Sequence, residues 1–188
     1  MGDIMNDVKS AFIDLARFID EQKKPLIIAI EGKCASGKTT LANMFLDKYC
    51  VIHIDDFFLP PHLKTKARLD EVGGNINYEA ISDMLAQIKE KKIIEYDKYD
   101  CHTDTYSHVS IPYNEVIILE GVYSFHPHFN KFIDKLVFLE TDVAEQRDRI
   151  NKRPNADMFY KVWMPLEAKY YQESGILKNV NRRIKKIN

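Results

Sequence analysis

Continuous apolar runs and helically spaced apolar positions alternate along this chain. Runs that are apolar throughout are typical of strands buried on both faces, and they predict strands at about residues 26–31, 50–54, 116–121 and 135–140. Apolar residues three or four positions apart predict helices at about residues 5–21, 38–48, 78–90, 143–152 and 157–173. Strands that alternate with helices favour an α/β fold with a parallel sheet.

Other segments lack this regularity. Residues 62–77 show neither the strand nor the helix spacing of apolar residues, and they contain two adjacent glycines, which predicts a mobile loop. Short alternating runs at 92–99 and 106–111 predict a tyrosine-rich hairpin. Pro165 should kink or restart its helix. The basic segment 176–188 fits either a last edge strand or a frayed end.

Length and charge narrow the class of protein. The 188 residues contain no linker-like stretch, so we expect one domain spanning residues 1–188. A formal charge of −1 argues against a broad nucleic-acid or membrane surface. Four aspartates within residues 1–20 oppose a signal peptide, so we expect a cytoplasmic protein. The chain has three cysteines, an odd number, and they lack metal-ligand spacing, which predicts reduced thiols. Assembly into a homo-oligomer stays open.

A phosphate-binding motif follows the first predicted strand. A loop that wraps a polyphosphate must turn its N–H groups inward, and glycines at 32 and 37 permit this. The expected nucleotide-binding residues are Gly32, Lys33, Cys34, Ala35, Ser36, Gly37, Lys38, Thr39 and Thr40. Lys38 would supply charge to the β- and γ-phosphates of ATP, and the Thr39 hydroxyl would ligate Mg²⁺. The alternative is a glycine turn that carries a Lys-Thr pair by chance.

Acidic residues follow two further predicted strands. Asp55 and Asp56 end the run at 50–54, and Glu120 ends the run at 116–121. Ligands bind at the carboxyl ends of parallel strands, so Asp55 and Asp56 are candidate ligand-binding acids and Glu120 is a candidate Mg²⁺-supporting carboxylate. Turn capping by the aspartates and a plain strand-terminal glutamate are the alternatives. The helix at 143–152 and its end carry Arg147, Arg149 and Arg153, which could clamp a transferring phosphoryl group or simply form a solvated face.

These motifs together resemble the uridine kinase group of P-loop kinases, whose relatives include nicotinamide riboside kinases and phosphoribulokinase. The resemblance covers about residues 25–172 and rests on the loop above, on Ile-Asp-Asp-Phe-Phe from residue 54 and on Leu-Glu-Gly-Val-Tyr-Ser from residue 119. It implies the three-layer α/β/α sandwich of P-loop NTPases, with a mainly parallel five-stranded sheet and an arginine-bearing lid at about 142–156. It also implies ATP and Mg²⁺ as cofactors and Asp55 as the catalytic base, which accepts the proton of the attacking hydroxyl and helps to organise Mg²⁺.

The acceptor is expected in the region of about 55–111, as a nucleoside-like small molecule. Aromatic and polar groups there suit a flat ring and a sugar: Phe57, Phe58, Arg68, Tyr96, Tyr99 and His102. Packing of the tyrosines against the domain is the alternative. Other acceptors, such as nicotinamide riboside, pantothenate or a phosphosugar, stay open, as does an ATP-binding module without transferase activity. A GTPase is disfavoured because both Asn-Lys pairs lack the following guanine-reading Asp.

Overall fold

A five-stranded parallel sheet organises the computed structural model, which describes residues 2–88, 90 and 93–185. Its strand order is β2 (Cys50–His53), β5 (Val116–Glu120), β1 (Leu26–Glu31), β6 (Lys135–Glu140) and β7 (Arg182–Lys185). All four strand pairs are parallel. The predicted strands and α/β class are confirmed, and the C-terminal segment forms the edge strand β7. Residues 186–188 of that prediction lie outside the described residues.

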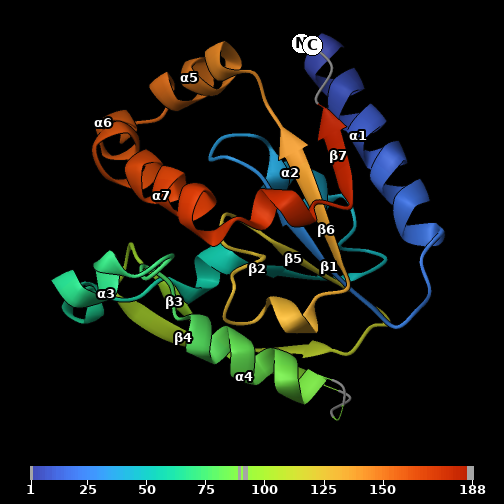
Figure 1. Cartoon of the computed structure of the whole chain (residues 1–188). Helices are drawn as coiled ribbons and strands as arrows, with labels where there is room; N and C mark the ends of the chain where they lie inside the picture. The colour runs from blue at the N-terminus through green and yellow to red at the C-terminus, as the bar shows by residue number, and fades with distance from the viewer. Residues whose placement is uncertain (1, 89, 91–92, 186–188) are drawn as a thin grey trace.

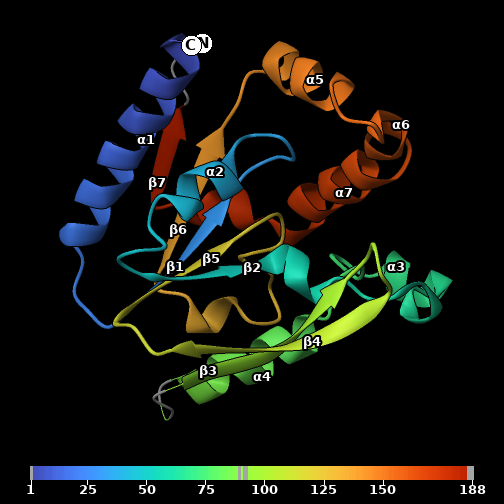
Figure 2. The same cartoon turned by 180° about the vertical axis from the view of Figure 1, so that it is seen from behind.

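Helices cover both faces of the sheet (Figures 1 and 2). Along β1, Ile27 and Ala29 belong to one core and the residues between and beside them belong to the other, because successive side chains of a strand point to opposite faces. One core is closed by α1 (Gly2–Asp20) and α2 (Lys38–Asn43). The other is closed by α4 (Tyr78–Ile88), the hairpin and α7 (Met164–Ser174). The three-layer prediction is therefore confirmed.

One helix prediction needs correction. The helix expected at 38–48 ends at Asn43, and the Phe45 and Lys48 N–H groups beyond it bond to carbonyls three residues back and form turns. The aromatic segment at 157–173 is helical as predicted, and it consists of α6 (Ala156–Met158), a π-helical turn (Phe159–Trp163) and α7, which begins next to Pro165. Pro165 has no N–H to continue the helical hydrogen bonds, which explains the wide turn just before it. The lid helix α5 spans Val143–Asn151.

The region at 62–77 is more ordered than predicted. It contains a 3₁₀ turn (Pro61–Leu63) and the short helix α3 (Lys66–Asp70), in which the Arg68 N–H donates to the capping Thr65 hydroxyl. The predicted hairpin is confirmed as antiparallel strands β3 (Ile93–Asp100) and β4 (Thr105–Pro112), with residue 92 of the prediction outside the described residues. Further 3₁₀ turns lie at Ile54–Phe57, Asn130–Phe132 and Ile176–Asn179.

Two absences concern the described part of the chain. No helix there combines the length and apolar character that crossing a bilayer would require. Its three cysteines, Cys34, Cys50 and Cys101, are free thiols, as predicted.

Candidate active site at the carboxyl ends of the central strands

The loop between β1 and α2 has the backbone conformation of a phosphate cradle. Gly37 has a φ of 95° and Gly32 a φ of 154°, values that residues with a side chain rarely adopt. A Cβ atom on Gly32 would lie 2.6 Å from the carbonyl oxygen of Leu139 on β6. Both glycines of the motif are thus required by the main chain, which supports the P-loop interpretation over a chance glycine turn.

Lys38 is held across this loop. Its side chain is buried, and Nζ donates a 3.0 Å hydrogen bond to the carbonyl oxygen of Lys33. Thr39 and Thr40 are exposed at the beginning of α2, and Ser36 is fully buried inside the loop. The cationic group therefore lies at the loop, ready to meet a phosphate charge.

Asp55 lies beside the loop, at the end of β2. It borders solvent, but desolvation by the surrounding protein raises its pKa and the charge of Glu120 raises it further, whereas Lys38 and His53 lower it. The pKa of Asp55 is higher than usual overall, because burial and the second carboxylate outweigh the cations. A carboxylate with a raised pKa, close to a phosphate cradle, is suited to accepting a proton.

Glu120 is buried at the end of β5, opposite His53 in the parallel pairing with β2. Its Oε1 lies 2.6 Å from His53 Nδ1, and this hydrogen bond raises the pKa of the histidine despite its partial burial. The other carboxylate oxygen, Oε2, is buried and has no hydrogen-bond partner among the described residues. Buried polar atoms normally have a partner, so Oε2 is available to a ligand or to a water held by one.

The oxygen atoms of Thr39, Asp55 and Glu120 fit a Mg²⁺ ion, which prefers carboxylate, hydroxyl and water oxygens. The orphaned Oε2 of Glu120 supports this fit. No group of three or more histidine, cysteine or acidic side chains with metal-site geometry occurs in the described ranges. Phosphate and water oxygens would therefore have to complete the coordination, as is usual for Mg²⁺ at nucleotide sites.

Two of the three predicted arginines reach the loop. Arg149 Nη1 donates a 2.9 Å hydrogen bond to the carbonyl oxygen of Ala35, and Nη2 pairs with Glu145. The Arg153 guanidinium lies over the Phe159 ring at 4.8 Å. Both arginines line a cavity of about 220 Å³ beside the loop, together with Val8, Ala11, Ala35, Ser36, Gly37, Thr40, Leu41 and Leu139. Arg147 is exposed on α5 and does not line this cavity.

Comparison with known proteins finds relatives named uridine kinase or uridine kinase-like protein. No family model matches the chain. It is 28% identical over 136 residues to a uridine kinase from Ureaplasma parvum, covering 65% of this chain and 66% of that protein. It is 27% identical over 149 residues to uridine kinase-like protein 4 from Arabidopsis thaliana, covering 73% of this chain and 32% of that protein. A solved structure described as a possible uridine kinase from Bacillus stearothermophilus superposes with a TM-score of 0.75 at 22% identity, covering 94% of this chain and 98% of the other.

In sequence, the chain therefore resembles uridine kinases and uridine kinase-like proteins. The chain matches about a third of the Arabidopsis relative and just under two thirds of the Ureaplasma one. The solved structure shows the fold alone.

Asp56 has a structural role in this uridine kinase-like chain. It is buried, accepts a 3.0 Å hydrogen bond from the Tyr96 hydroxyl and pairs with Lys98 Nζ at 2.7 Å. Its neighbour Asp55, in contrast, interacts electrostatically with Lys38 of the loop. This difference supports Asp55, rather than Asp56, as the candidate base.

Most residues predicted to hold the acceptor have other contacts. The Phe57 and Tyr96 rings stack on each other with centroids 4.8 Å apart, and both are buried in the core. The Tyr99 hydroxyl donates a 2.8 Å hydrogen bond to Asp104 within the hairpin. Packing, the alternative for the tyrosines, accounts for this arrangement. Phe58 is half-buried, and His102 is exposed in the turn between β3 and β4, where its role stays a prediction.

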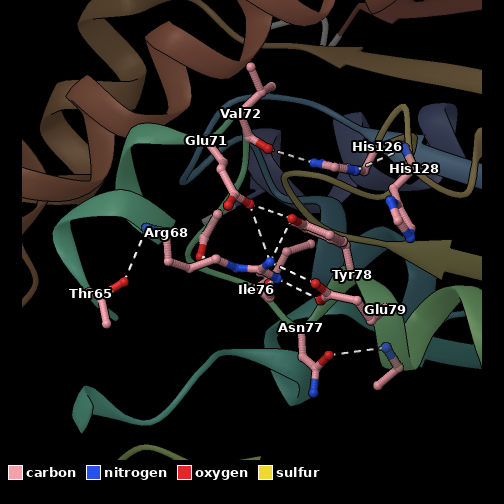
Figure 3. Close-up of polar contacts among 12 residues, drawn as sticks. Thr65, Arg68, Glu71, Val72, Ile76, Asn77, Tyr78, Glu79, His126 and His128 are labelled. Carbon is pink, nitrogen blue, oxygen red and sulfur yellow. Dashed lines mark hydrogen bonds and ion pairs between the residues drawn. The ribbon is translucent and has the colours of Figure 1, made fainter. Parts of the chain in front are cut away.

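Arg68 fastens the loop at 62–77, as Figure 3 shows. Its guanidinium donates to both carboxylate oxygens of Glu79, to Glu71 and to the Tyr78 hydroxyl. Two further bonds reach the carbonyl oxygens of Gly74 and Ile76. The prediction that Arg68 contacts the acceptor finds no support in this geometry, because its donor groups are already engaged. The same contacts explain why the predicted mobile loop is ordered.

His126 ties this loop to the segment after β5 (Figure 3). Nε2 lies 2.6 Å from the Val72 carbonyl oxygen, and Nδ1 accepts a 3.1 Å hydrogen bond from the His128 N–H. Burial lowers the pKa of His126, and a neutral ring with its proton on Nε2 satisfies both bonds. The loop is thereby held against the site.

Sequence reasoning missed Tyr123, which lies near the candidate base. It is buried and has a φ of 78°, an outlier for a bulky residue and one of the backbone features that gather at functional sites. It hydrogen-bonds with Asn75, and burial together with the charges of Glu167, Glu31 and Asp55 raises its pKa. Asn75 is also buried, and its Oδ1 has no partner in the described part of the chain. Its position in Glu-Gly-Val-Tyr could have drawn attention to Tyr123.

Proposed function

We propose that this chain transfers the γ-phosphoryl group of ATP to a hydroxyl group of a nucleoside-like small molecule. The observation that carries the proposal is the position of the Asp55 carboxylate, which lies within electrostatic reach of both Lys38 and Glu120 beside the P-loop. These groups come from three neighbouring strands, so one site contains a phosphate cradle, a cation and an acid. The names of the relatives are consistent with this function.

The chemistry follows from these positions. The acceptor oxygen attacks the γ-phosphorus, the bond to the β-phosphate oxygen breaks, ADP leaves, and the hydroxyl proton passes to the Asp55 carboxylate. Lys38 neutralises negative charge on the β- and γ-phosphates, and Arg149 and Arg153 approach from the lid. Mg²⁺, when bound through Thr39, Asp55 and Glu120, supplies further neutralisation of the phosphate charge. The protein's main contribution is to position the reactants.

Phe57 and Tyr96 bear on the identity of the acceptor, because their rings pack on each other in the core. Phe58, the next residue along the chain, is only half-buried. Tyr123 and Asn75 offer hydrogen bonds close to Asp55. This leaves a nucleoside-like acceptor as the first candidate, while a nicotinamide riboside, pantothenate or phosphosugar acceptor is the second.

The test is a panel of acceptors incubated with ATP and Mg²⁺, with ADP release and the mass of the phosphorylated product as readouts. We expect acceptor-dependent ADP formation with a nucleoside, and Lys38→Ala should abolish it while the variant keeps the melting temperature of the wild type. Near-normal turnover by that variant would falsify the kinase proposal. Tight ATP binding without turnover of any acceptor would favour a nucleotide-binding module instead.

A further inference from the structure

Three successive peptide units of the P-loop are each held by one side chain from helix α5 or α7. The Cys34 N–H donates a 2.7 Å hydrogen bond to Glu167 on α7. Gln146 on α5 donates a 2.9 Å hydrogen bond to the Cys34 carbonyl oxygen. Arg149, one turn further along α5, donates to the Ala35 carbonyl oxygen at 2.9 Å. These contacts join positions more than 110 residues apart, so helices late in the chain hold the corner of an early loop.

This arrangement fixes the conformation of Ala35. Its φ is 58°, in the left-handed region that residues with a side chain rarely occupy. Gln146 holds the peptide before Ala35 and Arg149 holds the peptide after it, so rotation about either bond of this residue breaks a hydrogen bond. In a planar trans peptide the C=O and N–H point in opposite directions. Because Gln146 draws the Cys34 carbonyl toward α5, the Ala35 N–H points away from α5, and it donates to no protein acceptor in the described ranges.

The Glu167 side chain is itself firmly placed. It is buried on α7, and the residues three and four positions later, Tyr170 and Tyr171, lie on the same face of the helix. Their hydroxyl groups donate 2.8 Å and 2.9 Å hydrogen bonds to Glu31, the last residue of β1. One face of α7 therefore holds the P-loop at its beginning and at its corner. Gln146 is likewise buried, on the face of α5 that meets the loop.

We propose that Glu167 and Gln146 are positioning residues that set the phosphate-binding conformation of the P-loop and so couple helices α5 and α7 to binding of the nucleotide donor. The inference rests on the proposed ATP-dependent function, since it assigns these residues to the donor half of that site. A movement of α5 or α7 removes the bonds that keep the Ala35 peptides aligned. Binding of the triphosphate, which needs this alignment, then favours the docked position of both helices by the same free energy.

Glu167→Ala, Glu167→Gln and Gln146→Ala test the proposal, with Glu173→Ala on the exposed side of α7 as the matched control. The readout is the dissociation constant of ATP with Mg²⁺ by titration calorimetry, without acceptor. We expect Glu167→Ala and Gln146→Ala to weaken ATP binding about tenfold, the effect of losing one buried hydrogen bond. Glu167→Gln keeps an oxygen that accepts from Cys34 and removes a negative charge beside the phosphates, so it should bind at least as tightly as the wild type.

Other outcomes would overturn the proposal. If Glu167→Ala binds ATP as tightly as Glu167→Gln, the charge matters and the hydrogen bond does not. If Glu167→Ala only lowers the melting temperature and ATP affinity is unchanged, the contact is purely structural. The outcome is separable from the kinase proposal: a chain that phosphorylates no acceptor can still show the binding pattern, and an active kinase with unchanged ATP affinity in these variants refutes only the positioning role.

Discussion

Replacing Glu31 by Gln should change how the stability of the protein depends on pH. Glu31 is the last residue of β1 and is completely buried. It accepts hydrogen bonds from the Phe125 N–H at 3.1 Å and from the Tyr170 and Tyr171 hydroxyl groups. Burial nevertheless dominates and raises the pKa of Glu31 from its ordinary value of 4.5 to about 7. The three hydrogen bonds and the charge of Lys38 lower it but do not compensate.

The sign and size of the effect follow from this shift. Between pH 4.5 and 7 the folded protein binds a proton at Glu31 that the unfolded chain has released, so the free energy of unfolding falls as pH rises through this range. Above about pH 7 the loss is complete. Each pKa unit corresponds to about 1.4 kcal/mol, so the folded state loses on the order of 3 kcal/mol at this residue. A glutamine has no charge to bury, and its amide oxygen can still accept from the Phe125 N–H and a tyrosine.

Urea unfolding of the wild type and Glu31→Gln at pH 5, 6, 7 and 8 measures this difference. The other titrating groups are common to both proteins, so the difference between the two unfolding free energies isolates Glu31. We expect the stability of Glu31→Gln relative to the wild type to rise by roughly 2.5 kcal/mol between pH 5 and pH 8. The exposed Glu173→Gln should run parallel to the wild type. A constant difference between wild type and Glu31→Gln at all four pH values would refute the reasoning.

Three further predictions concern the site and its support. Asp55→Asn should lower the single-turnover rate about a hundredfold or more and leave the melting temperature unchanged. Asp56→Asn loses the ion pair with Lys98 and should mainly lower the melting temperature. If the two variants show the reverse effects, Asp56 and not Asp55 is the candidate base. Gly32→Ala places a Cβ atom 2.6 Å from the carbonyl oxygen of Leu139 and should impair folding and ATP binding. The control Gly175→Ala is also at a positive φ but has open space around it, so it should lower the free energy of unfolding in urea by only about 1–2 kcal/mol. Equal losses of stability in the two variants would contradict the steric argument. Tyr96→Phe removes a hydrogen-bond donor from buried Asp56 and should lower stability by about 1–3 kcal/mol. The KM for the acceptor should not change. A raised KM would indicate that Tyr96 contacts the acceptor.

The features of this protein that depend on local geometry could be predicted from the sequence. Glycines at fixed spacing, between an apolar run and a helical stripe, define a phosphate loop because backbone conformation is set by neighbouring residues. Asp55 and Glu120 could be assigned to the same edge because parallel strands end together there. The sheet and its helices followed from periodicity, with errors of a few residues at helix ends such as that of α2, where packing of Phe45 competes with the helical hydrogen bonds.

The tertiary structure alone decided which side chains are free to meet a ligand. Composition marks Tyr96, Phe57 and Arg68 as good binding groups, yet the fold places two of them in the core and engages the third with Glu79. Glu167 shows the converse. Nothing in its neighbourhood along the chain marks it, because its partner Cys34 lies 133 residues away. A hydrogen bond between distant positions depends on how whole helices pack against the sheet, and that packing has no signature in the few residues around either partner.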